Sequence, residues 1–453
     1  MPQAALQEVL KAANFHSTGT AKIVGDDPVL PIRYRVAAAA SGALAALGLA
    51  VTQLHEKPQR IHVNARAAAV SLRSNRYLRV NGKPPPPVWD PMSGFYPVRD
   101  GWISIHCNFV NHRQAAARVL GAGEDRARAE QASRGWNGEA LEDAIHAAGG
   151  CAGYVRSHET WGHHAQAHAV AAQPLLQIQR IGDAPPGLLK KNSRPLGGVR
   201  VLDLTRVLAG PTCAKSLAEH GADVLKISAA HLPDNGVMDL DTGIGKRSAR
   251  IDLRDGNQIS VLQNLVRNAD VFVQSYRPGA LAARGFSPEA LAELRPGIIC
   301  ASLSAWGPSG PWSARRGFDS VVQAVSGIAH ANGDAEKPRL LPVSAIDYVS
   351  GYLMAFGVCA ALARRAREGG SWLVRVALAR VGKWIVDRGI VSDYKGLPED
   401  LPAAELEPLL GEMDCPEGRI RYLKPVLGLS ATPPHFSRPP VPLGYHQPAW
   451  TSG

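Results

Sequence analysis

The fold is decided by a stretch near the middle of the chain, Val199-Arg-Val-Leu-Asp-Leu-Thr-Arg-Val-Leu-Ala-Gly-Pro-Thr-Cys-Ala-Lys-Ser-Leu-Ala-Glu-His-Gly-Ala-Asp-Val-Leu-Lys-Ile227. A β-prone run at 199–204 is followed by a tight turn and by a helical pattern at 212–220, with a proline in its first turn. Gly221 ends that pattern, and the apolar run 223–227 predicts a second strand. Two such strands joined by one helix form a parallel pair with a right-handed crossover.

The same alternation continues toward the C-terminus. Strands are predicted at 248–253, 270–274 and 297–303, and helices at 256–268 and 288–294 lie between them. This order predicts an α/β fold, a doubly wound Rossmann-like large domain with ligand-binding loops after its strands. The fingerprint G-x-G-x-x-G is absent from these residues, which disfavours a nicotinamide or flavin cofactor.

One carboxylate, Asp347, stands at the start of an otherwise apolar, small-residue helix predicted over 341–365. An aspartate there most often caps the helix, and the alternative is that its carboxylate performs chemistry. A near-copy of this helix lies earlier: the pattern Ser-Gly-x-Leu-x-x-x-Gly begins at Ser41 and again at Ser350, 309 residues later. On this offset Asp347 corresponds to Ala38. The chain therefore holds two copies of a helix-strand unit, and only the later copy carries the carboxylate.

A smaller α+β domain is predicted before the large one. It contains a hairpin at 94–106 around Asp100-Gly101 and ends with a helix at 159–172. That helix carries His164 and His168 one turn apart beside His163, which invites a metal interpretation. No acidic ligand stands at suitable spacing nearby, so we expect no metal site.

The expected domain boundaries follow from these patterns and from a polar, proline-rich stretch at 185–195. The predicted parts are 1–72, a degenerate repeat of the active-site helix and strand; 73–182, the small α+β domain; 183–197, a linker; 198–385, the Rossmann-like large domain; and 386–453, a C-terminal extension.

The net charge and the spacing of basic residues and cysteines indicate which kinds of partner to expect. The net charge of +11 favours an anionic partner such as a phosphate-bearing cofactor. The basic residues are dispersed, without zinc-finger spacing or an aromatic-basic RNA signature, so nucleic acid is not expected. The six cysteines are far apart and form no C-x-x-C pair, and the apolar run 36–54 is mostly Ala and Gly. We expect a cytoplasmic protein with reduced thiols and no membrane contact.

The motifs of residues 196–380 resemble those of the class III CoA-transferases, which include formyl-CoA and carnitine CoA-transferases and the related α-methylacyl-CoA racemases. Residues 25–180 resemble the rear half of a family member, with a Tyr-Pro-x-x-Asp-Gly-Trp hairpin and a Glu-x-Trp-x-x-His helix. The chain thus looks like the rear half of one copy fused to the front half of another. The matching motifs of the front half stand in family order: Gly198 to Pro211, Gly221 to Ile227, Gly245 to Ser248, Tyr276 to Gly279, Gly285-Phe286, Gly317 to Asp319, and the Asp347 helix.

The resemblance implies a CoA-transferase that moves CoA from an acyl-CoA to a carboxylic acid acceptor. Asp347 would attack the thioester, giving a mixed anhydride and then an aspartyl-CoA thioester that the second acid resolves. A carboxylate suits this role, because it is ionised at neutral pH and needs no separate base. CoA would be a co-substrate, with no permanently bound cofactor. The implied CoA contacts are Leu208, Ala209, Lys246, Arg247, Ser275, Tyr276, Arg277, Arg284, Arg316, Gly317, Phe318 and Asp319.

The resemblance also implies an interlocked homodimer, or its equivalent fused within one chain. Two alternatives to transfer are open. Leu208 stands where some transferases have Gln, and Ser228-Ala229 stands where the family often has Glu followed by Arg or Pro. One repeat also lacks the nucleophile. These departures favour a catalytically silent acyl-CoA-binding subunit. A racemase is the other alternative, but racemases carry a His beside the Asp of the 317–319 motif, and Phe318 cannot move an α-proton.

Overall fold

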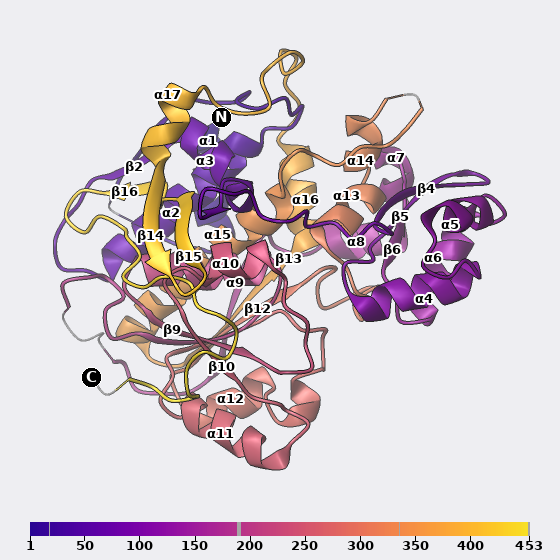
Figure 1. The fold of residues 1–453 in the computed structure, drawn as a ribbon. Helices are drawn as coiled ribbons and strands as arrows, with labels where there is room; N and C mark the ends of the chain where they lie inside the picture. The colour runs from indigo at the N-terminus through magenta and orange to yellow at the C-terminus, as the bar shows by residue number, and fades with distance from the viewer. Residues whose placement is uncertain (18, 188–191, 335, 452–453) are drawn as a thin grey trace.

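The computed structural model describes residues 1–17, 19–187, 192–334 and 336–451 (Figure 1). Part of the predicted linker, 188–191, and the last two residues of the predicted extension, 452–453, lie outside the described residues.

A seven-stranded sheet forms the centre of the molecule, in the order β10-β9-β8-β11-β12-β13-β7. Its first six strands are parallel, and β7 pairs antiparallel with β13 at one edge. Numbered along the chain, the parallel strands run 3-2-1-4-5-6, the doubly wound order, which confirms the predicted α/β class. The order reverses between β8 and β11, so the switch point lies beyond their carboxyl ends. The strands are β7 (Gln177–Gly182), β8 (Arg200–Leu204), β9 (Asp223–Ser228), β10 (Arg247–Arg250), β11 (Val271–Gln274), β12 (Ile299–Ser304) and β13 (Ser371–Ala377).

Helices cover both faces of this sheet because its strands are apolar on both sides. Val271 and Val273 of β11 belong to the core beneath α9 (Ala209–Glu219) and α15 (Ala345–Glu368). Phe272, between them, belongs to the core on the opposite face, beneath α11 (Gly256–Val266) and α12 (Pro288–Leu294). Successive side chains of a strand point to opposite faces, and this alternation supplies both cores.

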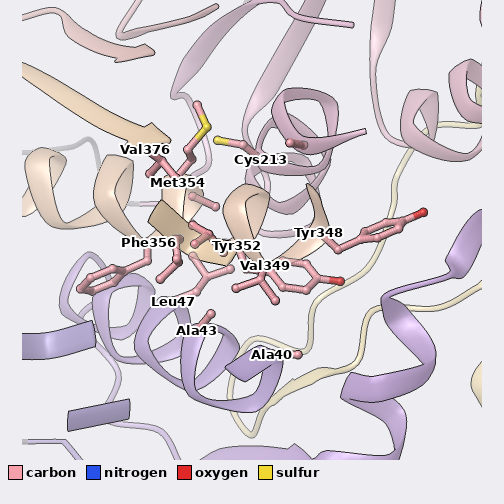
Figure 2. Close-up of a cluster of buried hydrophobic side chains, with 14 of the residues drawn as sticks. Ala40, Ala43, Leu47, Cys213, Tyr348, Val349, Tyr352, Met354, Phe356 and Val376 are labelled. Atoms are coloured by element: carbon pink, nitrogen blue, oxygen red, sulfur yellow. The ribbon is translucent and has the colours of Figure 1, made fainter. Parts of the chain in front are cut away.

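Two long apolar helices lie against each other above the sheet. Figure 2 shows Ala43 and Leu47 of α2 (Val36–Gln53) lying opposite Val349 and Tyr352 of α15. By length and composition both helices could cross a membrane, but their most apolar windows are 89% and 100% buried inside the fold. Small side chains let the two helices approach closely, so they form the main contact between the N-terminal part and the large sheet.

The small antiparallel sheet lies to one side of the molecule (Figure 1). Its strands β4 (Gly94–Val98) and β5 (Gly101–Ile105) confirm the predicted hairpin. The single helix predicted at 159–172 is wrong: two short helices replace it, and the His164 ring accepts the N–H of Gln166 at the start of the second. The remaining elements here are β6 (Ala152–Tyr154), α4 (Val110–Leu120), α5 (Arg126–Ser133), α6 (Gly138–Ala147), α7 (His158–Gly162) and α8 (Ala165–Ala171).

The C-terminal residues return to the N-terminal part through two further sheets, with strand orders β1-β2-β16 and β14-β15-β3. Their strands are β1 (Ala21–Val24), β2 (Ile61–Asn64), β3 (Arg79–Val80), β14 (Leu410–Cys415), β15 (Gly418–Leu423) and β16 (Leu427–Leu429). The other helices are α1 (Pro2–Ala12), α3 (Ala65–Ser71), α10 (Val237–Gly243), α13 (Asp319–Val325), α14 (Ile328–Asn332), α16 (Leu378–Asp387) and α17 (Ala403–Leu406).

Candidate functional site

Asp347 is the third residue of α15, and its side chain does not cap the helix. The N-cap position is held by Ser344, which makes no side-chain capping bond. The cap comes from another helix: Oδ2 of Asp319, at the start of α13, accepts the N–H of Asp347 at 2.9 Å, and the N–H of Ile346 donates to the same carboxylate. The capping interpretation of Asp347 is therefore wrong, because Asp319 already satisfies the exposed end of α15.

The carboxylate of Asp347 is consequently without a structural partner. Asp347 is 7% exposed, and its side chain accepts no hydrogen bond from any residue that the structure describes. Burial raises the pKa of Asp347 well above its usual range, and the nearby Asp319 carboxylate raises it further. Burial also raises the pKa of Asp319, to about 6, against the effect of its hydrogen bonds from α15 and Gln323. Burial and the Asp319 charge both oppose ionisation of Asp347 in the free protein, contrary to the expectation of an ordinary carboxylate.

On one side Asp347 faces the switch-point cavity, a space of about 460 Å³ formed by the loops after β8, β11 and β12. Binding at this place is the rule for doubly wound sheets, because the loops diverge where the strand order reverses. Val207, on its wall, has φ of 70°, a strained value for a β-branched residue. Nine of the predicted site residues come together here: Leu208, Ala209, Ser275, Tyr276, Arg277, Arg316, Gly317, Phe318 and Asp347.

The switch-point cavity is suited to an anion. Arg206, Arg277 and Arg316 line it, and none of them forms an ion pair with a carboxylate in the described part of the chain. Burial lowers the pKa of Arg206 and of Arg316, and Arg277 adds to the effect at Arg316. Guanidinium groups that repel one another in a partly buried space favour a phosphate or carboxylate ligand.

Four predicted contacts lie outside the switch-point cavity. The ammonium group of Lys246, 1% exposed, is 2.7 Å from Asp203, and burial lowers its pKa to about 8. Arg247 pairs with Asp223 at 3.1 Å, and Arg284 donates to the carbonyl of Leu253.

Lys246 and Arg247 lie outside the switch-point cavity because of their position in the sheet. Arg247 is the first residue of β10 and Lys246 comes directly before it, and both side chains are buried in pairs with Asp223 and Asp203 instead of standing in a loop beyond the strands. The fourth residue, Asp319, lies beneath α15 and lines a different space.

That different space, here named the second cavity, lies on the other side of Asp347 and measures about 320 Å³. The two cavities share one wall, made of Phe109, Val207, Leu208, Phe318 and Asp347. In this wall the Phe318 ring stacks on the His106 ring, with the ring centroids 3.9 Å apart and an interplanar angle of 4°. A single carboxylate therefore stands between two separate spaces.

The N-terminal half supplies lining residues that sequence reasoning missed. Phe109 and His112 complete the switch-point cavity, while Arg73 and Arg76 line the second. Nothing in the linear order indicates that residues 73–112 pack against the loops of the large sheet. Arg206 was also missed, and here a signal existed, since it follows the strand 199–204 directly.

A family model described as CoA-transferase family III matches residues 16–189 and 196–400. The probable fatty acyl-CoA transferase Rv3272 of Mycobacterium tuberculosis is 31% identical over 230 residues, 48% of this chain and 58% of that protein. The succinyl-CoA:glutarate CoA-transferase of Homo sapiens is 34% identical over 191 residues, 39% of this chain and 43% of that one. A crystal structure of Rv3272 covers 43% of this chain and 58% of its own, at 33% identity and a TM-score of 0.40.

The chain thus spans about half the length of the curated relatives it matches. The two segments that match the family model, by contrast, cover most of the chain, on both sides of the predicted linker. The chain belongs to CoA-transferase family III.

Proposed function

We propose that this protein transfers CoA between carboxylic acids and that Asp347 carries CoA during the transfer. One observation supports this most strongly: a buried carboxylate without a hydrogen-bond partner among the described residues stands between a cation-lined cavity and a second, separate one. A carboxylate with a purely structural role would be ion-paired or hydrogen-bonded, because burying an unpaired carboxylate destabilises the fold by about 3 kcal/mol.

The chemistry balances without any other reagent. The Asp347 carboxylate attacks the thioester carbonyl of an acyl-CoA, so that a mixed anhydride forms and CoA thiolate leaves. The thiolate then attacks the Asp347 carbonyl of the anhydride, which forms an aspartyl-CoA thioester and releases the first acid as a carboxylate. A second carboxylate repeats the two steps in reverse and departs as its CoA thioester. No proton is gained or lost overall, and Asp347 is regenerated.

The switch-point cavity would hold CoA. Arg206, Arg277 and Arg316 supply charge for its phosphates, and the N-terminus of α9 adds backbone N–H groups that no side chain caps. Lys246, Arg247 and Arg284 are engaged elsewhere, so we remove them from the proposed CoA contacts.

Asp319 is a positioning residue in this proposal. It fixes the N-terminus of α15, and its charge opposes ionisation of Asp347 until substrate binds. The fused half-copies, the homodimer and the cytoplasmic location expected from the sequence belong to the same proposal.

The competing proposal is a silent acyl-CoA-binding subunit, which the raised pKa of Asp347 favours. The two are separated by incubating the protein with a panel of acyl-CoAs and free acids and following exchange of CoA between them. We expect exchange for at least one donor and acceptor. Binding of acyl-CoA by calorimetry without any exchange would instead support the silent subunit.

A further inference from the structure

The loop that joins β12 to α13, residues 305–318, forms no helix or strand along its described length, yet it supplies a wall of the switch-point cavity. Its cavity-lining residues are Ala305, Arg315, Arg316, Gly317 and Phe318. Because such a loop has no ladder of backbone hydrogen bonds to fix it, its buried N–H and C=O groups need partners elsewhere. The position of Arg316 therefore depends on contacts with other parts of the molecule.

One buried side chain of the N-terminal half supplies several of those contacts. Gln166, in the first turn of α8, is fully buried. Its Nε2 donates to the carbonyls of Trp306 and Ser309, both at 3.0 Å, and its Oε1 accepts the N–H of Trp312 at 2.7 Å. The amide thus uses both of its donors and its acceptor on backbone groups of a single loop.

The loop also packs closely against this side chain and its surroundings. Gly310 has φ of 87°, and a Cβ at this position would lie 2.4 Å from Oε1 of Gln166, so the contact requires glycine. The Trp312 ring packs against the rings of Trp161 and His164, with centroids 5.5 and 4.4 Å away. The loop is therefore seated on α7 and the start of α8.

A further hydrogen bond extends this constraint to Arg316. The indole N–H of Trp306, a residue that is 1% exposed, donates to the carbonyl of Arg316 at 3.2 Å. Gln166 therefore fixes the backbone of Trp306, and Trp306 fixes the backbone of Arg316. The neighbouring arginine differs, because Nη2 of Arg315 pairs with Asp143 of α6 at 2.6 Å. Of the two adjacent guanidinium groups, that of Arg316 is the one that forms no ion pair in the described part of the chain.

We propose that Gln166 is a positioning residue for CoA binding: through Trp306 it holds Arg316 where the guanidinium group meets a phosphate of CoA. This inference rests on the proposed function, in which the switch-point cavity holds CoA. Without the three hydrogen bonds of Gln166, the loop has to be ordered when CoA binds, and the cost of that ordering weakens binding. Asp347 and its cap from Asp319 are not touched by the change.

Calorimetry with CoA tests this role without requiring catalysis. Gln166→Met nearly keeps the length and volume of the side chain and removes all three hydrogen bonds. We expect CoA to bind about 10-fold more weakly, provided that thermal unfolding shows a folded protein. In the exchange reaction, KM for the acyl-CoA should rise by a similar factor while kcat stays within about twofold of wild type. The matched control is Gln177→Met, since Gln177 lies in β7 and its amide bonds Gln179.

A double-mutant cycle separates the positioning of Arg316 from general destabilisation. In an Arg316→Gln background, Gln166→Met should weaken CoA binding by less than about twofold, because the guanidinium group that it positions is absent. Equal weakening in both backgrounds would show a purely structural Gln166 and would overturn the inference. Should Gln166→Met fail to fold, Trp306→Phe takes its place in the cycle with the same expected outcomes, since it keeps an aromatic ring in the core and removes the N–H that bonds Arg316.

The outcomes also separate this inference from the proposed function. Unaltered CoA affinity in the variant, with exchange intact, would contradict the positioning role alone. CoA binding that depends on Gln166 in this way, without exchange for any acyl-CoA and acid, would support the positioning role and refute the transfer function. A wild-type protein that binds no CoA would overturn both.

Discussion

The N-terminus of α2 and the N-terminus of α15 are capped in the same way. At α2 the Asp27 carboxylate accepts the N–H groups of Ala37 and Ala38 at 2.9 and 2.8 Å. At α15 the Asp319 carboxylate accepts those of Ile346 and Asp347. The offset of 309 residues that aligns the two serines also aligns these donors, and burial raises the pKa of both capping carboxyls to about 6.

The packing matches as well. A Cβ on Gly42 of α2 would meet Ala5 of α1 at 2.6 Å, and one on Gly351 of α15 would meet the carbonyl of Ala209 in α9 at the same distance. Six residues further along each helix, a Cβ on Gly48 would lie 2.7 Å from Ile61 of β2, and a Cβ on Gly357 would lie 2.6 Å from Val374 of β13. Helix α1 therefore packs on α2 as α9 packs on α15.

The difference lies in what surrounds the shared frame. Helix α15 stands over a seven-stranded sheet whose loops form the switch-point cavity, while α2 adjoins a three-stranded sheet, and Ala38 is fully buried. The capping carboxylate and the close-packing glycines are thus requirements of folding, since both copies retain them. The carboxylate at 347 is not such a requirement, since the copy with Ala38 folds without it.

The largest expected effect comes from Asp347→Asn. Exchange should fall at least about 1,000-fold, because an amide cannot form the anhydride. Stability should not fall, since Asp319 and not Asp347 caps the helix. The exchange assay and urea unfolding measure the two effects. Asp27→Asn makes the same chemical change at the capping carboxylate of the other copy and should leave exchange unaltered. Exchange within about tenfold of wild type in Asp347→Asn would place the chemistry elsewhere.

The converse substitution, Ala38→Asp, restores the missing carboxylate in the first copy. It should destabilise the protein by about 3 kcal/mol, because it buries an unpaired charge next to Asp27. No second active site should appear. Ala38→Asn, similar in volume but uncharged, separates crowding from charge in urea unfolding. A second covalent CoA adduct in Ala38→Asp would show that the two copies differ only in that side chain.

A pH effect on stability should distinguish the capping carboxyls from ordinary ones. The folded pKa of Asp27 is about 6, above its unfolded value of 3.8, so the folded state binds the proton more tightly. This contribution is fully present below the unfolded pKa and is lost as the pH rises through about 6, at a cost of about 3 kcal/mol. Urea unfolding from pH 4 to 7 should show a smaller decline in Asp27→Asn than in wild type. Identical pH profiles would mean that the Asp27 carboxyl is not shifted.

The smallest effect concerns Asp319. Its charge raises the pKa of Asp347, so Asp319→Asn should move the acid limb of the pH–kcat/KM profile for exchange to lower pH. A merely structural Asp319 would lower the rate at every pH without moving the limb. Asp27→Asn should leave the limb in place.

The large sheet and its ligand-binding edge were predictable, because strand and helix periodicity are local and the alternation of elements fixes a doubly wound order. The loops carrying Leu208, Tyr276 and Arg316 followed from that order. Lys246 was included among the CoA contacts on the family resemblance, but it directly precedes a strand and its ammonium group is buried beside Asp203. The cap from Asp319 depends on a contact between helices separated in sequence, which no local pattern encodes.

The second cavity could not be predicted either, because it also depends on contacts between parts of the chain that are far apart in the sequence. Arg73 and Trp89 line the same cavity as Asp347 only because residues far apart in the sequence pack together there. Such long-range placement depends on surface complementarity that periodicity does not describe.

The central claim is that Asp347 becomes covalently bound to CoA. Intact-mass analysis of the protein after incubation with an acyl-CoA should show a gain equal to CoA less water, hydroxylamine should remove it, and peptide mapping should place it on Asp347 in α15. The adduct should be absent from Asp347→Asn and present in Asp27→Asn. A protein that exchanges CoA between acids while Asp347 stays unmodified, or an adduct on any other residue, would contradict the account.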